Sequence, residues 1–382
     1  MMRRLMAITA AAVALAVLAA CSTTKKEDLP AELPHFKPQF TPKKIWSLGL
    51  GHGQPKLLLG IGPTVDGERI YGTNTIGEVV ALDLKTGKRV WTRKLKQPLS
   101  GGTGAGNGLV LVTGTNGTLH ALSEKDGSDR WYVQLSSEVL TAPVVTEDLV
   151  IVRTVDGKLY GLEAKNGTQR WIADQQVPRL TLRGTSQPVV AGELVICGFD
   201  NGRLMAVTLA TGNTAWDVAV GQPRGSSELQ RLIDVDSPAA VDGDDVFAVD
   251  FQGRAVRLAR ETGLEIWSHE LSSYRGLVAD PLGVYVSTTG GEVIKLDRAS
   301  GAERWRQQGL VRRTLTGLAQ QRNALVVADY KGYIHWINSE DGKLLARAKG
   351  RARITATPVV AGDLVVVQTE TGRIEVWRAQ WK

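Results

Sequence analysis

Hydrophobic and polar residues alternate along most of the chain in short runs that are separated by glycine-containing turns. After Gly117, for example, Leu119 and Ala121 alternate with polar neighbours, which is the period-two pattern of a strand with one buried face. A β-branched run at 109–112 precedes this glycine, and the pair Asn116-Gly117 suits a two-residue hairpin turn. No repeat shows a helical period. The pattern therefore predicts an all-β fold.

The alternating pattern belongs to one motif that recurs along the chain. In each full copy a second glycine follows the first by ten residues, and a tryptophan or its equivalent follows by fourteen. The copies begin at Gly77, Gly117, Gly157, Gly202, Gly253, Gly291, Gly332 and, cut short, at Gly372. Four strands in a repeat of about 40 residues are typical of a propeller blade. We predict an eight-bladed β-propeller of four-stranded antiparallel blades over residues 43–382.

The two ends of the repeat array predict how the ring closes. The eighth copy lacks an outermost strand, while a spare strand-like segment at 43–46 precedes the first copy and ends in Trp46. This N-terminal strand should complete blade eight and leave no exposed sheet edge at the seam.

Seven of the ten tryptophans share one position of the repeat. They are Trp46, Trp91, Trp131, Trp171, Trp216, Trp267 and Trp305. We interpret them as structural wedges between neighbouring blades, since a large ring placed once per blade can bury about 150–250 Å². A sugar-binding or peptide-binding set of aromatic residues is the alternative interpretation.

The N-terminal residues read as an export signal followed by a spacer. Arg3 and Arg4 precede an apolar stretch at 5–20 that is too short to cross a bilayer comfortably. Prolines at 30, 34, 38 and 42 then favour an extended, polyproline-like tether over 21–42. We predict a signal peptide over 1–20, and no later segment is long and apolar enough to indicate a polytopic membrane protein.

Composition narrows the class of protein further. The chain is 43% hydrophobic, which excludes disorder as a whole, and its formal net charge of +7 is too mild over 382 residues to predict a nucleic-acid partner. Only Cys197 remains once Cys21 is set aside, so no internal disulfide can form. Cys197 lies in an apolar run at 194–197, which indicates a small buried side chain.

The sequence offers no recognisable catalytic or metal-binding motif. Its five histidines occupy dissimilar positions of the repeat, and there is no paired Cys-x-x-Cys, no Gly-x-Ser-x-Gly elbow and no phosphate-binding loop. We therefore predict no catalytic residues, no metal and no cofactor.

Two stretches of sequence resemble known families. The run Leu-Ala-Ala-Cys at 18–21 resembles the lipobox of bacterial lipoproteins, which implies acylation of Cys21. Ser22, in place of an aspartate, implies by the same analogy an outer-membrane anchor with the protein facing the periplasm. A plain secretory peptide with an incidental cysteine is the alternative.

The motif Ala-Leu-Asp-x-x-Thr-Gly-x-x-x-Trp at 81–91 resembles the repeat of quinoprotein (PQQ) dehydrogenase propellers.

Together, the lipobox, the tether and the eight repeats resemble the BamB family, lipoprotein subunits of the outer-membrane β-barrel assembly machinery. This resemblance implies a non-catalytic scaffold that binds the periplasmic domains of BamA and aids the folding and insertion of outer-membrane proteins, with nascent outer-membrane proteins as a second class of partner. A quinoprotein-like dehydrogenase and a polysaccharide-binding outer-membrane lipoprotein are the alternatives. Against the first, a quinoprotein site needs an adjacent pair of cysteines, and Cys197 stands alone.

Two departures from the repeat point to a binding surface. The distance from the tryptophan to the next glycine is enlarged after Trp171 and after Trp216, in the same connection of two successive blades. Such connections lie on one face of a propeller, so the two long loops should touch or nearly touch, and surface loops on a rigid scaffold commonly carry binding. By resemblance to BamB proteins, the predicted partner-binding residues in these loops are Leu180, Leu182, Arg183, Asp234 and Asp236. Alternatively, the leucines fill the local core and Arg183 pairs with one of the aspartates.

Overall fold

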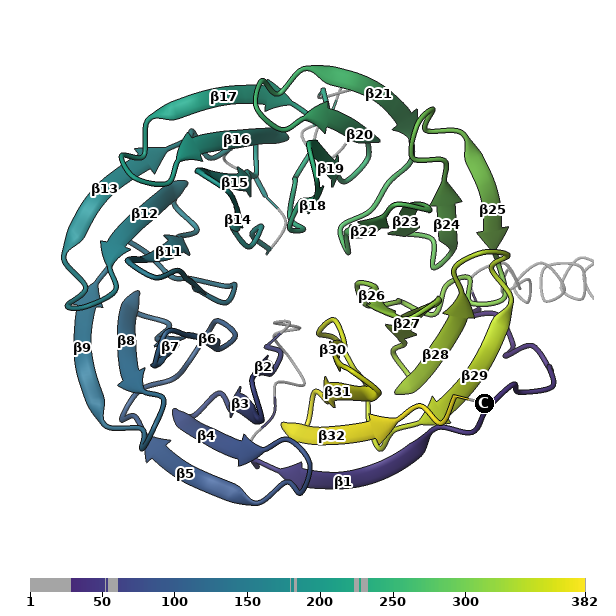
Figure 1. Cartoon of the computed structure of the whole chain (residues 1–382), viewed down its shortest axis with the longest axis horizontal. Helices are drawn as coiled ribbons and strands as arrows, with labels where there is room; N and C mark the ends of the chain where they lie inside the picture. The colour runs from purple at the N-terminus through teal and green to yellow at the C-terminus, as the bar shows by residue number, and fades with distance from the viewer. Residues whose placement is uncertain are drawn as a thin grey trace, which may run out of the picture.

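The computed structural model describes residues 29–51, 53, 61–178, 180–181, 184–222, 227 and 233–381. In this part of the chain all regular structure is β-strand, from β1 to β32. The strands form eight separate four-stranded sheets arranged around a central axis (Figure 1). No helix in the described part is long and apolar enough to cross a membrane.

Each sheet is one blade, and its strands run from the axis to the rim in the order given. Blades 1 to 4 contain, in turn, β2 (Thr64–Asp66), β3 (Arg69–Thr73), β4 (Glu78–Asp83), β5 (Arg89–Lys94); β6 (Gly104–Gly106), β7 (Leu109–Thr113), β8 (Thr118–Ser123), β9 (Asp129–Gln134); β10 (Val144–Val145), β11 (Leu149–Arg153), β12 (Lys158–Glu163), β13 (Gln169–Asp174); β14 (Val189–Ala191), β15 (Leu194–Gly198), β16 (Arg203–Thr208), β17 (Thr214–Ala219). Blades 5 to 8 contain β18 (Ala240–Asp242), β19 (Asp245–Val249), β20 (Arg254–Ala259), β21 (Glu265–Glu270); β22 (Leu277–Asp280), β23 (Gly283–Ser287), β24 (Val293–Leu296), β25 (Glu303–Gln307); β26 (Ala319–Gln321), β27 (Ala324–Ala328), β28 (Tyr333–Asn338), β29 (Leu344–Lys349); β30 (Val359–Ala361), β31 (Leu364–Gln368), β32 (Arg373–Arg378), β1 (Lys43–Gly49). The predicted eight-bladed antiparallel propeller is confirmed.

The ring is closed by strands from both ends of the chain. Strand β1 pairs with β32 in antiparallel register, with Lys43 opposite Arg378 and Trp46 opposite Val376. Figure 1 shows the purple N-terminal strand lying outside the yellow C-terminal strands. The predicted completion of blade 8 by the N-terminal strand is confirmed.

The hydrophobic core is divided among the eight junctions between blades. Each junction holds one cluster of buried side chains drawn from both neighbours; the cluster between blades 4 and 5, for example, contains Ile196 and Val246. In β15 the next residue, Cys197, points to the opposite junction with blade 3. The second and third strands of each blade are therefore buried on both faces, and the expected half-buried pattern is wrong for them because each blade is covered on two sides.

The repeated tryptophans lie in or against the clusters of buried side chains at these junctions. Each indole Nε1 donates to a backbone carbonyl of the next blade, at 2.7 to 3.2 Å. Trp171 donates to the Leu209 oxygen, and its ring lies on Gly212, where a Cβ would come within 2.6 Å of the ring. Gly212 has a φ of 71°, a conformation that costs glycine little. The second glycine of each repeat is thus the seat for the tryptophan of the preceding blade.

Blade 7 lacks the tryptophan and is sealed differently. Ala346 stands in its place on β29, and Phe40 from the N-terminal segment enters the same cluster of buried side chains. Phe40 packs edge-on against Trp336, with ring centres 6.0 Å apart, and lies 4.4 Å from the ring centre of Trp381. The segment ahead of β1 therefore supplies the missing aromatic side chain.

One face of the ring carries every connector from the outermost strand of a blade to the innermost strand of the next. The same face carries the turn between the second and third strands, because seven of the connectors begin by donating a backbone N–H to a carbonyl of that turn, and in the connector after β25 Arg312 donates to the Gly290 carbonyl. Examples are Leu95 to Gly77, Val220 to Gly202 and Gly350 to Gly332. We call this the connector face.

Candidate docking site on the connector face

Three connectors are longer than the rest. Residues 50–63 join β1 to β2 at the seam of the ring, and the other two, which we call the long connectors, lie side by side. Residues 175–188 join β13 to β14, and residues 220–239 join β17 to β18, whereas the connector between β5 and β6 spans only 95–103. The two long connectors flank blade 4 on the connector face. Their placement on one face agrees with the sequence prediction.

Direct contacts hold the two long connectors together. The Ser186 hydroxyl donates to the backbone oxygen of Ser237 at 2.9 Å. Gly184 lies so close to Asp236 that a Cβ there would be 2.9 Å from its carboxylate carbon. Ile233 covers Gly202 of blade 4 in the same way. The connectors are therefore anchored to one another and to the blade beneath them.

The predicted partner-binding residues differ in exposure. Leu180 is 44% exposed, and Val177 beside it is 36% exposed. Asp236 is half-buried, and Asp234 is completely buried, with its backbone oxygen accepting from the Phe251 N–H at 3.0 Å. Leu182 and Arg183 lie outside the described residues, as does Cys21. The alternative that both leucines fill the core does not hold for Leu180.

A buried group of charged side chains underlies the long connectors, and no sequence pattern predicted it. Arg153, at the end of β11, forms an ion pair with Asp200 at 3.3 Å, with both side chains almost fully buried. The guanidinium also lies 4.5 Å from the centre of the Phe199 ring. Burial raises the pKa of Asp236 well above its usual range, and the nearby Asp234 and Asp200 carboxylates add to the shift while Arg153 opposes it. Arg153 thus offsets part of the acidic charge beneath the long connectors.

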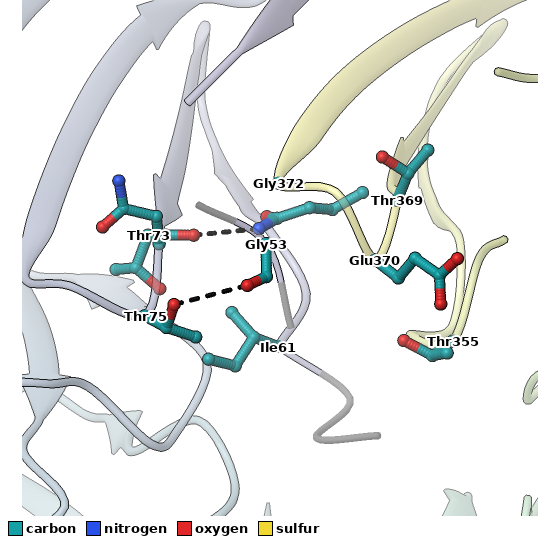
Figure 2. A pocket seen from close by; sticks show the side chains of 10 residues that line it. Gly53, Ile61, Thr73, Thr75, Thr355, Thr369, Glu370 and Gly372 are labelled. Carbon is teal, nitrogen blue, oxygen red and sulfur yellow. Dashed lines mark hydrogen bonds between the residues drawn. The ribbon is translucent and has the colours of Figure 1, made fainter. Parts of the chain in front are cut away.

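The described residues also line two hollows away from these connectors. Figure 2 shows a small pocket at the seam of blades 8 and 1, where Gln368 donates to the Thr73 carbonyl at 2.9 Å and Thr75 donates to the Gly53 carbonyl at 3.5 Å. Its volume of about 20 Å³ is of the order of a single water site. A more open hollow of about 430 Å³ lies between blades 1 and 2 on the opposite face, and both acidic and basic side chains, such as Glu68 and Lys125, line it. Neither adjoins the long connectors.

Comparison with known proteins identifies the family. The sequence pattern of the family described as "Outer membrane protein assembly factor BamB" matches residues 75–307 and 289–380. A Pseudomonas aeruginosa protein with that same description is 46% identical over 364 residues, covering 95% of this chain and 96% of the relative. The chain belongs to the BamB family. The crystal structure of BamB from Moraxella catarrhalis superposes with a TM-score of 0.82 at 25% identity, covering 88% of this chain and 99% of that one.

The resemblance to dehydrogenases extends only to the fold. A quinohemoprotein alcohol dehydrogenase from Comamonas testosteroni superposes with a TM-score of 0.70 at 14% identity, covering 88% of this chain and 76% of the enzyme. In this BamB family member Cys197 is buried, as predicted, and desolvation raises the pKa of its thiol to about 12. No group of His, Cys, Asp or Glu in the described ranges is arranged to hold a metal ion.

Part of the predicted tether of this BamB family member contacts the propeller. Its described part, residues 29–42, packs on the rim between blades 6 and 7. Ala31 donates its N–H to the Val311 carbonyl at 3.0 Å, and Gln39 donates to the Leu345 carbonyl at 2.8 Å. The proline spacing indicated an extended backbone but could not show that the segment has a binding groove on its own propeller.

The family member should show a pH dependence that originates at Asp250, beneath connector 220–239. Burial raises the pKa of Asp250 to about 7, although the hydrogen bond that its carboxylate accepts from the Arg254 backbone N–H acts to lower the pKa. The folded state therefore takes up a proton between about pH 7 and pH 4 that the unfolded state does not, so the free energy of unfolding rises as pH falls. Asp250→Asn should stabilise the protein by roughly 2–4 kcal/mol at pH 8 and have little effect at pH 4, measured by chemical denaturation across pH.

Asp126 provides a control of opposite sign. Hydrogen bonds from Ser128 lower its pKa to about 2 on an exposed turn, so its stabilising contribution is lost as pH falls. The Asp126→Asn variant should therefore have a slightly lower free energy of unfolding than the wild type at pH 7, and the two values should converge near pH 2. Parallel pH profiles for the Asp250→Asn variant and the wild type would contradict the assignment to Asp250.

Proposed function

We propose that this protein is a non-catalytic scaffold lipoprotein of the outer-membrane β-barrel assembly complex. It is anchored by an acylated Cys21 in the outer membrane, faces the periplasm and binds the periplasmic domains of BamA through its two long connectors. The observation that carries the proposal is the contact between these connectors on one face, with Leu180 left exposed at their surface. The names of the relatives as assembly factors support it.

In the proposed binding site, some connector residues contact the partner and others hold the connectors in shape. Leu180 and Val177 offer apolar side chains to a partner, and Leu182 and Arg183 follow in the same connector. An apolar anchor beside hydrogen-bonding groups is typical of an interface hot spot. Asp234 and Asp236 would act differently: Asp234 is completely buried, and the half-buried Asp236 packs against Gly184 of the other connector, so both shape the connectors rather than contact a partner.

A scaffold role is also consistent with the regularity of the remaining ring. The indole wedges and the junction clusters make the propeller a rigid platform, and binding loops held on such a platform lose little conformational entropy on docking. Nascent outer-membrane proteins remain a predicted second class of partner.

The proposal predicts that Leu180→Glu abolishes co-purification of BamA with the membrane-extracted protein. A charge placed at an apolar hot spot must be desolvated without a partner, which costs several kcal/mol and lowers affinity by a factor of a hundred or more. Leu264→Glu is the matched control, because Leu264 is 70% exposed on the opposite face of blade 5. Co-purification is measured by affinity capture and mass spectrometry of the bound proteins.

The melting temperature of the Leu180→Glu protein and its recovery of BamA together test the docking site. The Leu180→Glu protein should keep a melting temperature within about 2 °C of the wild type, as expected for a surface substitution. Normal recovery of BamA with the Leu180→Glu protein would overturn the assignment of the long connectors, and equal loss with Leu264→Glu would show a general effect of added negative charge.

A further inference from the structure

The N-terminal segment lies in a built groove on the rim of the ring. Arg313 donates to the Ala31 carbonyl at 3.0 Å, and Arg347 donates to the Pro34 carbonyl at 3.2 Å. Arg313 is itself buried and fixed by Asp329 at 2.6 Å, and the Arg347 guanidinium lies 5.0 Å from the ring centre of Phe36. These contacts hold residues 31–40 as a strap across blades 6 and 7.

The strap fixes where the chain leaves the propeller toward Cys21. At its start, Ala31 pairs with Val311, which lies in the connector between β25 and β26 and therefore on the connector face. Only ten residues separate Ala31 from Cys21, and a fully extended chain of that length spans at most about 36 Å. An acyl group on Cys21 would hold this part of the connector face close to the bilayer.

A basic patch surrounds this exit point. It consists of Arg312, Lys331, Lys349, Arg351 and Arg353, and we call it the exit patch. Backbone contacts make the patch continuous: Tyr330 donates to the Arg313 carbonyl, Gly350 to the Gly332 carbonyl and Glu370 to the Arg353 carbonyl. The Lys349 ammonium donates to the Lys331 carbonyl.

The exit patch carries a net positive charge that other side chains do not neutralise. Arg312, Lys331, Lys349 and Arg351 are exposed and Arg353 is half-exposed. None of the five forms an ion pair with an acidic side chain of the described residues. Among the nearby acids, Glu370 is half-buried, and the buried Glu375 is paired with Lys44 at 3.0 Å and accepts from the Arg351 backbone N–H at 3.2 Å.

We propose that the exit patch binds the anionic headgroups of a phospholipid bilayer and tilts blades 6 to 8 toward the membrane. Basic residues close to an anionic bilayer contribute additively to binding, and an acyl anchor together with a polybasic surface makes a more stable attachment than either alone. The partner is identified as a bilayer because the strap leads from this patch to the anchor. Leu29, 68% exposed next to the exit point, adds an apolar contact.

The tilt leaves the long connectors available. They flank blade 4, which lies across the ring from blade 8, and blade 5 separates them from blade 6 (Figure 1), so the exit patch can face the bilayer while the docking site stays clear of it. The inference rests on the acylation of Cys21 in the proposed function and is independent of the partner that the long connectors bind.

The test measures the distance from the connector face to the bilayer in the acylated full chain. A donor dye is attached to Thr371→Cys, an exposed position on the connector face of blade 8, and the acceptor is a headgroup-labelled lipid. Cys197 is buried and will not compete for the dye. The protein is reconstituted in vesicles of phosphatidylcholine alone or with phosphatidylglycerol, and Leu282→Cys on the opposite face reports on the far side.

Energy transfer from position 371 should be higher in vesicles that contain phosphatidylglycerol and should fall to the neutral-vesicle level at about 1 M salt, where the Debye length is about 3 Å. The triple variant Lys331→Glu/Lys349→Glu/Arg351→Glu should remove this increase. Each cation near an anionic surface favours the docked orientation by about fivefold, so removing three cations should lower the ratio of docked to undocked orientations by about a hundredfold. The matched control is Lys88→Glu/Lys125→Glu/Lys165→Glu, three exposed lysines on the opposite face.

Three outcomes would overturn the inference. One is equal transfer in neutral and anionic vesicles; another is an equal loss in the control triple variant, which would make net charge the cause. The third is a chain recovered without acyl groups on Cys21, seen by mass spectrometry of its N-terminal peptide. The third outcome would also contradict the anchor in the proposed function, whereas the first two leave the proposed function standing. The Leu180→Glu experiment concerns the long connectors alone, so docking of BamA and docking to the bilayer are tested separately.

Discussion

Replacing Trp171 by alanine should lower the free energy of unfolding by about 3–5 kcal/mol, because a buried indole is deleted and a cavity is left between blades 3 and 4. The ring is 5% exposed, lies on Gly212 and donates to the Leu209 carbonyl at 2.8 Å. For a propeller of this size such a loss lowers the melting temperature by roughly 4–7 °C.

The neighbouring residue provides the control for this experiment. Ile172 lies on the same strand but is 42% exposed, so Ile172→Ala should change the free energy of unfolding by less than about 1 kcal/mol. Calorimetry and chemical denaturation of the two variants measure the difference. Equal losses in the two variants would show that the tryptophan is not a wedge.

Replacing Arg153 by methionine should lower the free energy of unfolding by a similar amount, about 3–5 kcal/mol at pH 7, because Asp200 then remains buried without its cation. The raised pKa of Asp236, and of Asp200 through burial, means that these carboxyls take up protons in the folded state more readily than in the unfolded state. Their protonation removes the unpaired charge, so the loss should shrink as pH falls from 7 toward 5. Denaturation at both pH values measures the change.

The double variant Arg153→Met/Asp200→Asn distinguishes a charge effect from a packing effect. Neutralising both partners of a buried ion pair leaves no unpaired charge, so the double variant should recover a large part of the loss. A double variant no more stable than Arg153→Met would show that the guanidinium acts through its packing on Phe199.

The elements that the sequence could predict are those that the repeat encodes locally. The spacing of Gly77 and Trp91 is set within one blade, so its recurrence gives the blade count and the positions of the wedges. The contact between the long connectors also follows, because both occupy the same connection of successive blades.

The elements that it could not predict depend on contacts between distant segments. Arg153 and Asp200 come from neighbouring blades, at repeat positions where no other blade has an arginine or an aspartate, and Phe40 replaces a tryptophan that only blade 7 lacks. The burial of Asp234 depends on the way connector 220–239 folds over blade 5, which its composition does not reveal. Period-two patterning likewise cannot distinguish a strand covered on one side from a strand covered on both.

The pairing of β1 with β32 also constrains the order of assembly. A chain made from its N-terminus produces β1 first, yet Lys43 finds its partner Arg378 only when almost every later residue is present. Closing so long a loop is entropically costly and slow. Until then, β1 is an unpaired edge that can recruit strands from other molecules. The last blade can therefore form only when the chain is complete to β32. In a chain truncated before β30, β1 would have no strand to pair with.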